Sequence, residues 1–311
     1  MSDVIRRPRA LRAGDRVAVV APASPFDRDE FERGLVELRT LGFEPVYQPS
    51  VFAREGYMAG SAQVRADALM EAWRDPSIAA IVAARGGYGS VHLLPLLDRS
   101  VFDGPPKAFI GYSDNTSLMT WLTVTCGIVT FHGPMIEGRF ARGAEGYDRD
   151  TFERCLRTAA PAGAITHPSI EVIKGGSASG MLIGGTMTQL AASLGTPYAF
   201  EPPEGCVLFL DEVGERPYRV DRIYTQLRLA GIIDRASALV FNELPRCTEP
   251  SGTSTVRELA AALTQDFHGP VLFGLPSGHT DGPTLTLPFG VTARVEAESS
   301  PTLFIEDSAV L

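Results

Sequence analysis

The chain has 311 residues, of which 44% are hydrophobic and 21% are charged, and its formal net charge is -9. This length predicts two domains, and the composition is that of a soluble globular protein rather than a disordered one. The negative charge argues against a nucleic-acid partner, because phosphate binding needs a basic surface.

The cysteines and the apolar stretches bear on the cellular compartment. Cys126, Cys155, Cys206 and Cys247 lie far apart without CxxC spacing, which predicts reduced, buried thiols rather than disulfides or a zinc site. Residues 1–17 carry several arginines but no apolar stretch after them, so we expect no secretory signal. No run of 18 apolar residues is present, so we expect no membrane span. Together these absences predict a cytoplasmic protein.

The first half of the chain alternates strand-like and helix-like patterns. We expect strands at residues 16–21, 43–47, 78–83 and 108–111, and helices at 27–41, 61–75, 91–97 and 115–125. Pro45 places the second strand near a sheet edge, and Ser61 is a typical helix N-cap. This order indicates parallel βαβ units, and therefore an N-terminal doubly wound parallel sheet.

The second half is richer in strand-like runs. We expect strands at residues 207–210, 238–241, 271–274, 285–287 and 291–295, and helices at 219–230 and 255–264. Residues 141–180 are polar and Gly-rich around a helix near 149–158. We therefore predict an N-terminal α/β domain at 1–150, a connecting segment at 151–174 and a C-terminal β-rich domain, a partial barrel, at 175–311.

Ser113 follows an apolar strand and a glycine and precedes a helix. This arrangement is that of a nucleophile elbow, in which a hydroxyl stands at the carboxyl end of a parallel strand. The amide of Asp114 would then point at a developing oxyanion. The pattern is G-x-S-x-N rather than G-x-S-x-G, and a simple helix cap explains Ser113 or Asp114 equally well.

Residues 85–89 (Arg-Gly-Gly-Tyr-Gly) follow another strand of the same sheet. Glycines let backbone approach a ligand closely, so the amide of Gly87 could be a second oxyanion donor and Arg85 could hold a carboxylate. A plain tight turn is the alternative. The spacing does not fit G-x-G-x-x-G, so we expect no dinucleotide cofactor.

The candidate bases and acids lie mostly in the second half. His279 lies in a polar loop between strands, and His132 is its main competitor as a base. Strand 207–210 leads to Asp211 and Glu212, either of which could orient a histidine, unless the acids only pair with nearby arginines. No histidines have metal-ligand spacing, so we expect no metal.

These segments together resemble the LD-carboxypeptidase family, the S66 serine peptidases, over nearly the whole chain. The resemblance is carried by residues 85–89, 111–114, 130–135, 184–185, 194–197, 215–222, 278–279 and 285–288. It implies a Ser-Glu-His triad, with Ser113 as nucleophile and His279 as base. The family Glu falls on Asp211, and Thr186 stands where the family usually has Asn. It also implies a two-domain fold and a homodimer.

The sequence favours Asp211 over Glu212 as the acid. Side chains alternate along a strand, so Val207, Phe209 and Asp211 share one face and Glu212 lies on the other. Glu212 remains the alternative if the chain twists there. We also expect Arg85, Gly86 and Tyr112 to bind substrate.

The resemblance implies a specific activity: cleavage before the C-terminal D-Ala of murein tetrapeptides, in cell-wall recycling. Two alternatives stay open. One is an amidase of the same family that inactivates a peptidyl-nucleotide antibiotic. The other is a non-catalytic protein that binds muropeptides.

Overall fold

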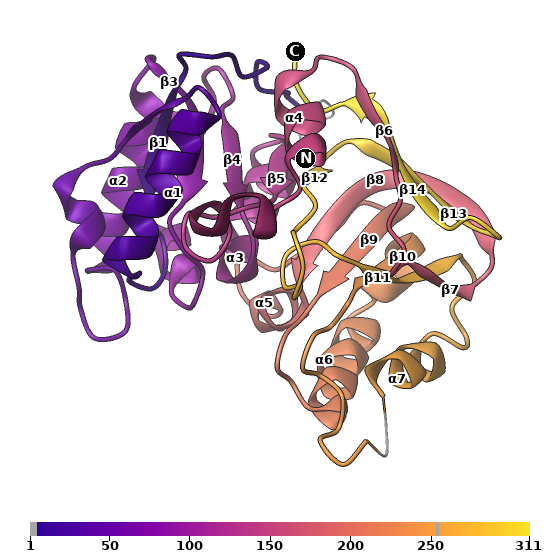
Figure 1. Cartoon of the computed structure of the whole chain (residues 1–311). Coiled ribbons are helices and arrows are strands. Elements are labelled where there is room, and N and C mark those ends of the chain that lie inside the picture. The colour runs from indigo at the N-terminus through magenta and orange to yellow at the C-terminus, as the bar shows by residue number, and fades with distance from the viewer. Residues whose placement is uncertain (1–4, 253–254) are drawn as a thin grey trace.

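A computed structural model describes residues 5–252 and 255–311, and its strands form two sheets packed side by side (Figure 1). The N-terminal half of the chain builds most of the first sheet, and the C-terminal half builds the second. Residues 1–4, the start of the stretch in which we expect no secretory signal, lie outside the described residues. Within the described part, no helix has the length and apolar character needed to cross a membrane.

The first sheet has six strands in the order β12-β5-β4-β3-β1-β2. They are β1 (Arg16–Val20), β2 (Glu44–Val46), β3 (Ile78–Ala83), β4 (Ala108–Gly111), β5 (Thr130–His132) and β12 (Leu287–Phe289). The first five are parallel, and β12 pairs with β5 in the antiparallel direction. β2 is an edge strand, as Pro45 predicts. The prediction of a wholly parallel sheet is therefore corrected at one edge.

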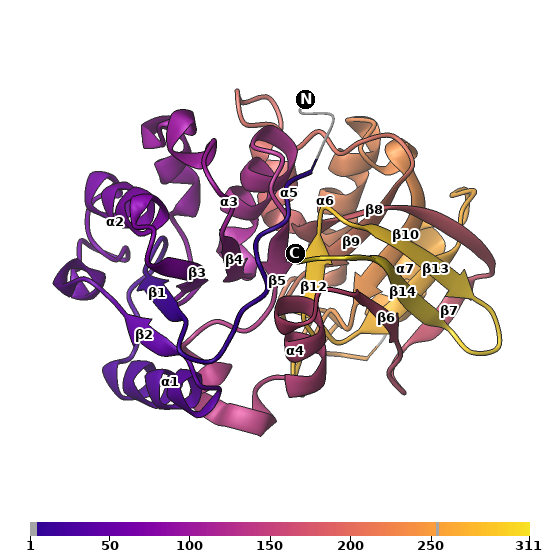
Figure 2. The same cartoon turned by 90° about the horizontal axis from the view of Figure 1, so that it is seen from above.

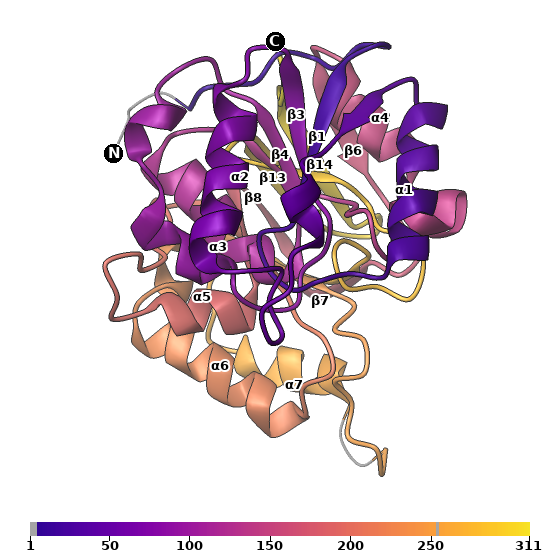
Figure 3. The same cartoon turned by 90° about the vertical axis from the view of Figure 1, so that its left-hand side faces the viewer.

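Helices cover both faces of this sheet, as a doubly wound fold requires (Figures 2 and 3). They are α1 (Arg28–Thr40), α2 (Ala62–Arg74) and α3 (Thr116–Thr120), which continues as a π-helical turn at Trp121–Thr125. Asp27 and Ser61 cap α1 and α2 by accepting from the amides of Glu30 and Val64. Where we expect a helix at 91–97, residues Ser90–Leu96 form a 3₁₀ segment that contains Pro95.

The second sheet has eight strands in the order β6-β14-β13-β8-β9-β10-β11-β7. They are β6 (Pro161–Ile165), β7 (Glu171–Lys174), β8 (Gly176–Thr186), β9 (Cys206–Asp211), β10 (Ala236–Asn242), β11 (Val271–Leu275), β13 (Thr292–Ala297) and β14 (Thr302–Ser308). Strands β6 and β7 lie at opposite edges, although only residues 166–170 separate them in the chain. The sheet therefore curls toward closure, in agreement with the predicted partial barrel.

Strand β9 separates two apolar cores. Val207 and Phe209 belong to the core that both sheets share, whereas Leu208 and Leu210 belong to a second core. Helices α5 (Met187–Ser193), α6 (Pro217–Leu229) and α7 (Val256–Leu263) cover the second core, and α4 (Arg149–Arg157) lies against the first. The predicted α/β fold class with a β-rich second half is confirmed.

Several elements differ from the sequence-based expectations. The polar, Gly-rich stretch between residues 158 and 180 contains β6, β7 and the first part of β8, whose side chains are largely half-buried or exposed. Strands β5 and β14 and helix α5 were also not expected. The strand expected at 285–287 is β12, and it joins the first sheet rather than the second. The domain limits 1–150, 151–174 and 175–311 stay predictions.

Candidate active site

Ser113 stands in a strained turn at the carboxyl end of β4. Its φ angle is +64°, a left-handed conformation that is unusual for a residue other than glycine. Strain of this kind costs about 1–3 kcal/mol and is concentrated at functional sites. The backbone turns directly from β4 into the 3₁₀ turn Ser113–Asn115 and then into α3. The strand-turn-helix geometry that the sequence pattern predicts for a nucleophile elbow is present at Ser113.

Gly86 contacts Ser113 across the sheet end. A Cβ atom at Gly86 would lie 2.9 Å from Ser113 Oγ and 3.5 Å from the Asp114 nitrogen, so only glycine fits here. Gly87 faces a different neighbour, since a Cβ at that position would lie 2.3 Å from Ser24 Oγ. The loop backbone therefore borders Ser113 and the Asp114 amide at Gly86.

His279 forms a hydrogen-bonded chain with Ser113 and Asp211. Its Nε2 lies 3.1 Å from Ser113 Oγ, and its Nδ1 lies 2.7 Å from Asp211 Oδ2. Because the carboxylate accepts the Nδ1 proton, Nε2 is left to accept the Ser113 hydroxyl proton. The structure thus brings together three predicted residues that are 68 and 166 positions apart along the chain.

Asp211 is fully buried and accepts several hydrogen bonds. Its carboxylate accepts from the His279 amide at 3.2 Å, from Thr186 Oγ1 at 2.9 Å and from Asn242 Nδ2. Burial raises the pKa of this carboxyl, but the charge and hydrogen bond of His279, with smaller contributions from His132 and Thr186, leave the pKa below its usual range. Asp211 is therefore an anion that orients His279.

Glu212 points away from His279. Its carboxylate accepts from the amide and hydroxyl of Thr188, at 3.0 and 2.7 Å, and from the amide of Val213. Burial raises the pKa of Glu212. The alternation of side chains along β9 holds to its end, so only Asp211 faces the histidine.

His132, the competing base, is buried behind the triad. Its Nδ1 lies 2.9 Å from Ser277 Oγ, and its Nε2 lies 4.0 Å from Asp211 Oδ2. Ser277 donates to the carbonyl of Leu285, so the proton of the His132 ring lies on Nδ1. Burial lowers the pKa of His132 to about 4. The ring is therefore neutral, and Asp211 separates it from the nucleophile's base.

The predicted substrate-binding residues occupy different surroundings. Tyr112 is buried, and its ring packs edge-on against His279 with centroids 5.2 Å apart. The guanidinium of Arg85 is half-exposed, donates to the carbonyl of Pro25 at 2.9 Å and lies 3.5 Å from Glu137. Arg85 therefore has partners within the protein, which a substrate carboxylate would have to displace or join.

Three supporting residues escaped the sequence analysis: Asn242, Ser277 and Arg139. Asn242 ends β10, the strand beside β9, and its amide group also donates to the His279 carbonyl at 2.7 Å. Its position could have been found from the rule that parallel strands deliver their last residues to one edge. Ser277 and Arg139 lie in irregular segments, where no periodic pattern marks them.

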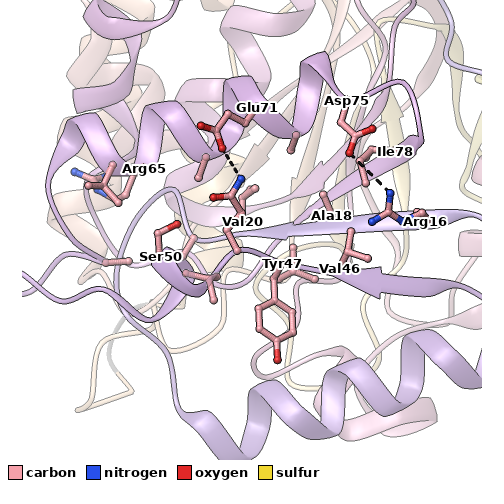
Figure 4. Close-up of a pocket in the computed structure, with 18 residues that line it drawn as sticks. Arg16, Ala18, Val20, Val46, Tyr47, Ser50, Arg65, Glu71, Asp75 and Ile78 are labelled. Carbon is pink, nitrogen blue, oxygen red and sulfur yellow. Dashed lines mark hydrogen bonds and ion pairs between the residues drawn. The ribbon is translucent and has the colours of Figure 1, made fainter.

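Two cavities bear on the location of the site. One of about 220 Å³ lies beside the nucleophile and is lined by Asp114, Ser117, Thr188 and Gln189 among others. Another of about 360 Å³ lies between α2, β1 and β2 (Figure 4). Neither cavity is lined by Ser113, Asp211 or His279. Glu71 of α2 hydrogen-bonds Gln48 across the second cavity. The first cavity borders the residue next to the candidate nucleophile, because its lining includes Asp114, which directly follows Ser113.

Potential metal ligands and thiols were compared across the part of the chain that the structure describes. There, no group of three or more His, Cys, Asp or Glu side chains is arranged to hold a metal ion. The four cysteines are free and buried, and burial raises the pKa of the Cys155 thiol to about 12. These thiols are poor nucleophiles and metal ligands.

Comparison with known proteins identifies the family. Residues 17–133 match the model of the LD-carboxypeptidase N-terminal domain, and residues 179–295 match that of the C-terminal domain. The chain belongs to the LD-carboxypeptidase family. It is 36% identical to a putative carboxypeptidase of Streptomyces coelicolor, over 98% of this chain and 97% of that protein.

Two further LD-carboxypeptidase relatives have more specific names. A murein tetrapeptide carboxypeptidase of Pseudomonas aeruginosa is 31% identical, over 90% of this chain and 93% of its own. The crystal structure of a muramoyltetrapeptide carboxypeptidase from Oxalobacter formigenes superposes with a TM-score of 0.83 at 28% identity, covering 94% of this chain and 99% of that one. The family resemblance read from the sequence is confirmed.

Proposed function

We propose that this LD-carboxypeptidase releases the C-terminal D-Ala from murein tetrapeptides, with Ser113 as nucleophile, His279 as general base and Asp211 as orienting acid. The observation that carries the proposal is the unbroken hydrogen-bonded chain from Asp211 through His279 to Ser113. The names of the murein-processing relatives support the substrate class.

The proposed reaction proceeds by acyl transfer. Ser113 Oγ attacks the carbonyl carbon of the bond before D-Ala while His279 Nε2 takes the hydroxyl proton. The protonated ring then returns this proton to the leaving D-Ala amine, and the acyl group stays on Ser113. Water, activated by the same nitrogen, hydrolyses the ester and restores the serine. Asp211 stabilises the imidazolium in both steps.

The oxyanion would bind at the helix start. The Asp114 amide belongs to the first turn after Ser113, where backbone N–H groups have no partner within the helix. The loop at Gly86 and Gly87 supplies the second donor in this proposal, with Gly87 as the candidate. The leaving group's carboxylate would bind beside Arg85, and another part of the peptide would enter the cavity next to Asp114.

Turnover of a defined peptide tests this proposal. The substrate is L-Ala-γ-D-Glu-diaminopimelate-D-Ala, and released D-Ala is measured. Ser113→Ala should lose on the order of 10³-fold or more in rate, because nucleophile and base act as a unit. The exposed serine Ser100, replaced by Ala, is the matched control. A wild-type protein that leaves this peptide and its Lys-containing analogue intact would contradict the proposal.

The remaining features of the proposal concern the setting of the enzyme. We propose that it works in the cytoplasm, on peptides returned from the wall, as a homodimer. Light scattering on the purified protein tests the dimer, and fractionation of the producing cells tests the compartment. An antibiotic-inactivating amidase would instead cleave a peptidyl-nucleotide faster than the tetrapeptide.

A further inference from the structure

Arg139 is a buried cation in which every N–H group meets a neutral oxygen. Its side chain is only 5% exposed and lies in the segment that follows β5. Nε donates to the hydroxyl of Tyr112 at 3.2 Å, and one terminal nitrogen donates to the carbonyl of Gly146 at 3.4 Å. None of its five acceptors is a carboxylate, so ion pairing does not explain why a charge is buried here.

The other three acceptors belong to the loop that carries His279. The guanidinium donates to the carbonyls of Gly278 at 2.7 Å, Thr280 at 2.9 Å and Gly282 at 3.0 Å. Two of these carbonyls flank His279 directly. A guanidinium has five N–H groups, and all five are used. Three bonds to one short loop fix the backbone on both sides of the candidate base.

The contact with Tyr112 connects the same arginine to the nucleophile strand. Tyr112 directly precedes Ser113, and its ring packs edge-on against His279. Burial raises the pKa of Tyr112, so the phenol remains protonated and its oxygen can accept from Arg139. The guanidinium thus touches both the segment before the nucleophile and the loop that holds the base.

We propose that Arg139 is a positioning residue, which sets the alignment of His279 with Ser113 across two segments from opposite halves of the chain. This inference rests on the catalytic roles proposed for those two residues. Lysine could not replace it, because an ammonium has three N–H groups and no planar fork. Removing the guanidinium would leave three buried carbonyls and one half-buried carbonyl without these donors and free the loop to move.

Arg6 offers a matched control. Its guanidinium also donates to four backbone carbonyls, those of Phe102, Asp103, Gly104 and Cys126, at 2.6–3.1 Å. It contacts neither the His279 loop nor Tyr112 through these bonds. An arginine that is only structural should behave as Arg6 does, with an effect on unfolding but not on turnover.

The first experiment compares Arg139→Ala, Arg139→Lys and Arg6→Ala in turnover of the tetrapeptide. Misplacement of catalytic groups by about 1 Å costs on the order of 10²-fold, so we expect that loss in kcat for Arg139→Ala, with KM nearly unchanged. Millimolar guanidinium chloride should raise the kcat of Arg139→Ala about tenfold, whereas sodium chloride should not. Arg139→Lys provides a folded variant if the alanine form is unstable, and it should lose kcat as well.

A second measurement does not depend on the substrate. The Nδ1 proton of His279, bonded to Asp211, should give a downfield proton resonance in protein labelled with ¹⁵N-histidine. We expect this resonance to broaden or vanish in both Arg139 variants and to persist in Arg6→Ala. If the resonance persisted in the Arg139 variants and their kcat were unchanged, the inference would be overturned. If the wild type does not cleave the peptide, the proposed function fails, and the resonance still decides the role of Arg139.

Discussion

The carboxylate of Asp211 lies 2.7 Å from Nδ1 of His279, although an aspartate is one methylene shorter than the glutamate implied by the family resemblance. The adjacent Glu212 binds Thr188 instead. We therefore expect Asp211→Ala to lower kcat on the order of 10⁴-fold, as in other serine triads, because the histidine loses its orientation. Glu212→Ala, measured in the same assay, is the control and should lower stability more than kcat. A large kcat loss confined to Glu212→Ala would reverse the assignment.

The base can be assigned by comparing two histidines. His279 contacts Ser113, whereas His132 contacts Ser277 and lies 4.0 Å from Asp211 Oδ2. His279→Ala should therefore cost on the order of 10³-fold or more in kcat. His132→Asn, which keeps a donor toward Ser277, should cost far less. If the His132 variant proved the more damaged, the base would have to be sought there.

His132 also makes a testable contribution to acid stability. Its pKa is lowered by burial from 6.5 to about 4, so the unfolded chain binds a proton in this window while the folded protein does not. Stability therefore falls as pH drops from 6.5 toward 4, by about 2–3 kcal/mol from this side chain. The free energy of unfolding can be measured in urea at pH 7 and at pH 4.5. We expect it to change less between these pH values in His132→Asn than in the wild type.

The control for this measurement is His268→Asn, because His268 is exposed. The free energy of unfolding of this variant should change between the two pH values as much as that of the wild type. The absolute stability of His132→Asn at pH 7 will be lower, since a smaller side chain replaces a fully buried ring. An equal pH difference in all three proteins would show that His132 is protonated in the folded state.

Recognition of the substrate carboxylate can be tested at Arg85. A carboxypeptidase must bind that group, and arginine binds it in a bidentate fork. We expect Arg85→Ala to raise KM for the free acid about tenfold and to have little effect on a C-terminally amidated peptide. Glu137→Gln removes the negative charge that lies 3.5 Å from Arg85 and should lower KM. Equal turnover of acid and amide by the wild type would exclude this role.

Metal removal distinguishes the serine mechanism from a zinc mechanism. We expect activity to survive exhaustive dialysis against a chelator, because the proposed nucleophile is activated by His279 alone. The measurement is D-Ala release before and after dialysis, with a known zinc peptidase treated in parallel. Loss of activity that added zinc restores would reject the proposed mechanism.

The sequence predicts elements well where one pattern decides them. The buried run Ile78–Ala83 forms β3 as expected, and Ser61 caps α2. Strand β8 escaped prediction, because its first half is Gly- and Ser-rich and exposed or half-buried. Its strand state depends on pairing with β9 and β13, which local sequence does not reveal.

The candidate site was likewise only partly predictable from the sequence. The approach of Ser113, His279 and Asp211 is anticipated, since each occupies a position where a family pattern or strand end points to it. The surroundings of Asp211 are not, because Asn242 and Thr186 meet it only through strand neighbours. The need for glycine at position 278 also depends on a residue far away in the chain, because a Cβ there would lie 2.4 Å from the His132 ring.

Strand β12 completes the first sheet from a part of the chain that is synthesised long after β5. Leu287 pairs with His132, so the early segment leaves the ribosome with an open sheet edge beside the future site. Until residues Leu287–Phe289 emerge, that edge can pair with another chain, and chaperone capture at this stage would protect the nascent protein. A gene fragment ending near residue 150 should consequently aggregate when expressed alone and regain solubility when the C-terminal half is co-expressed.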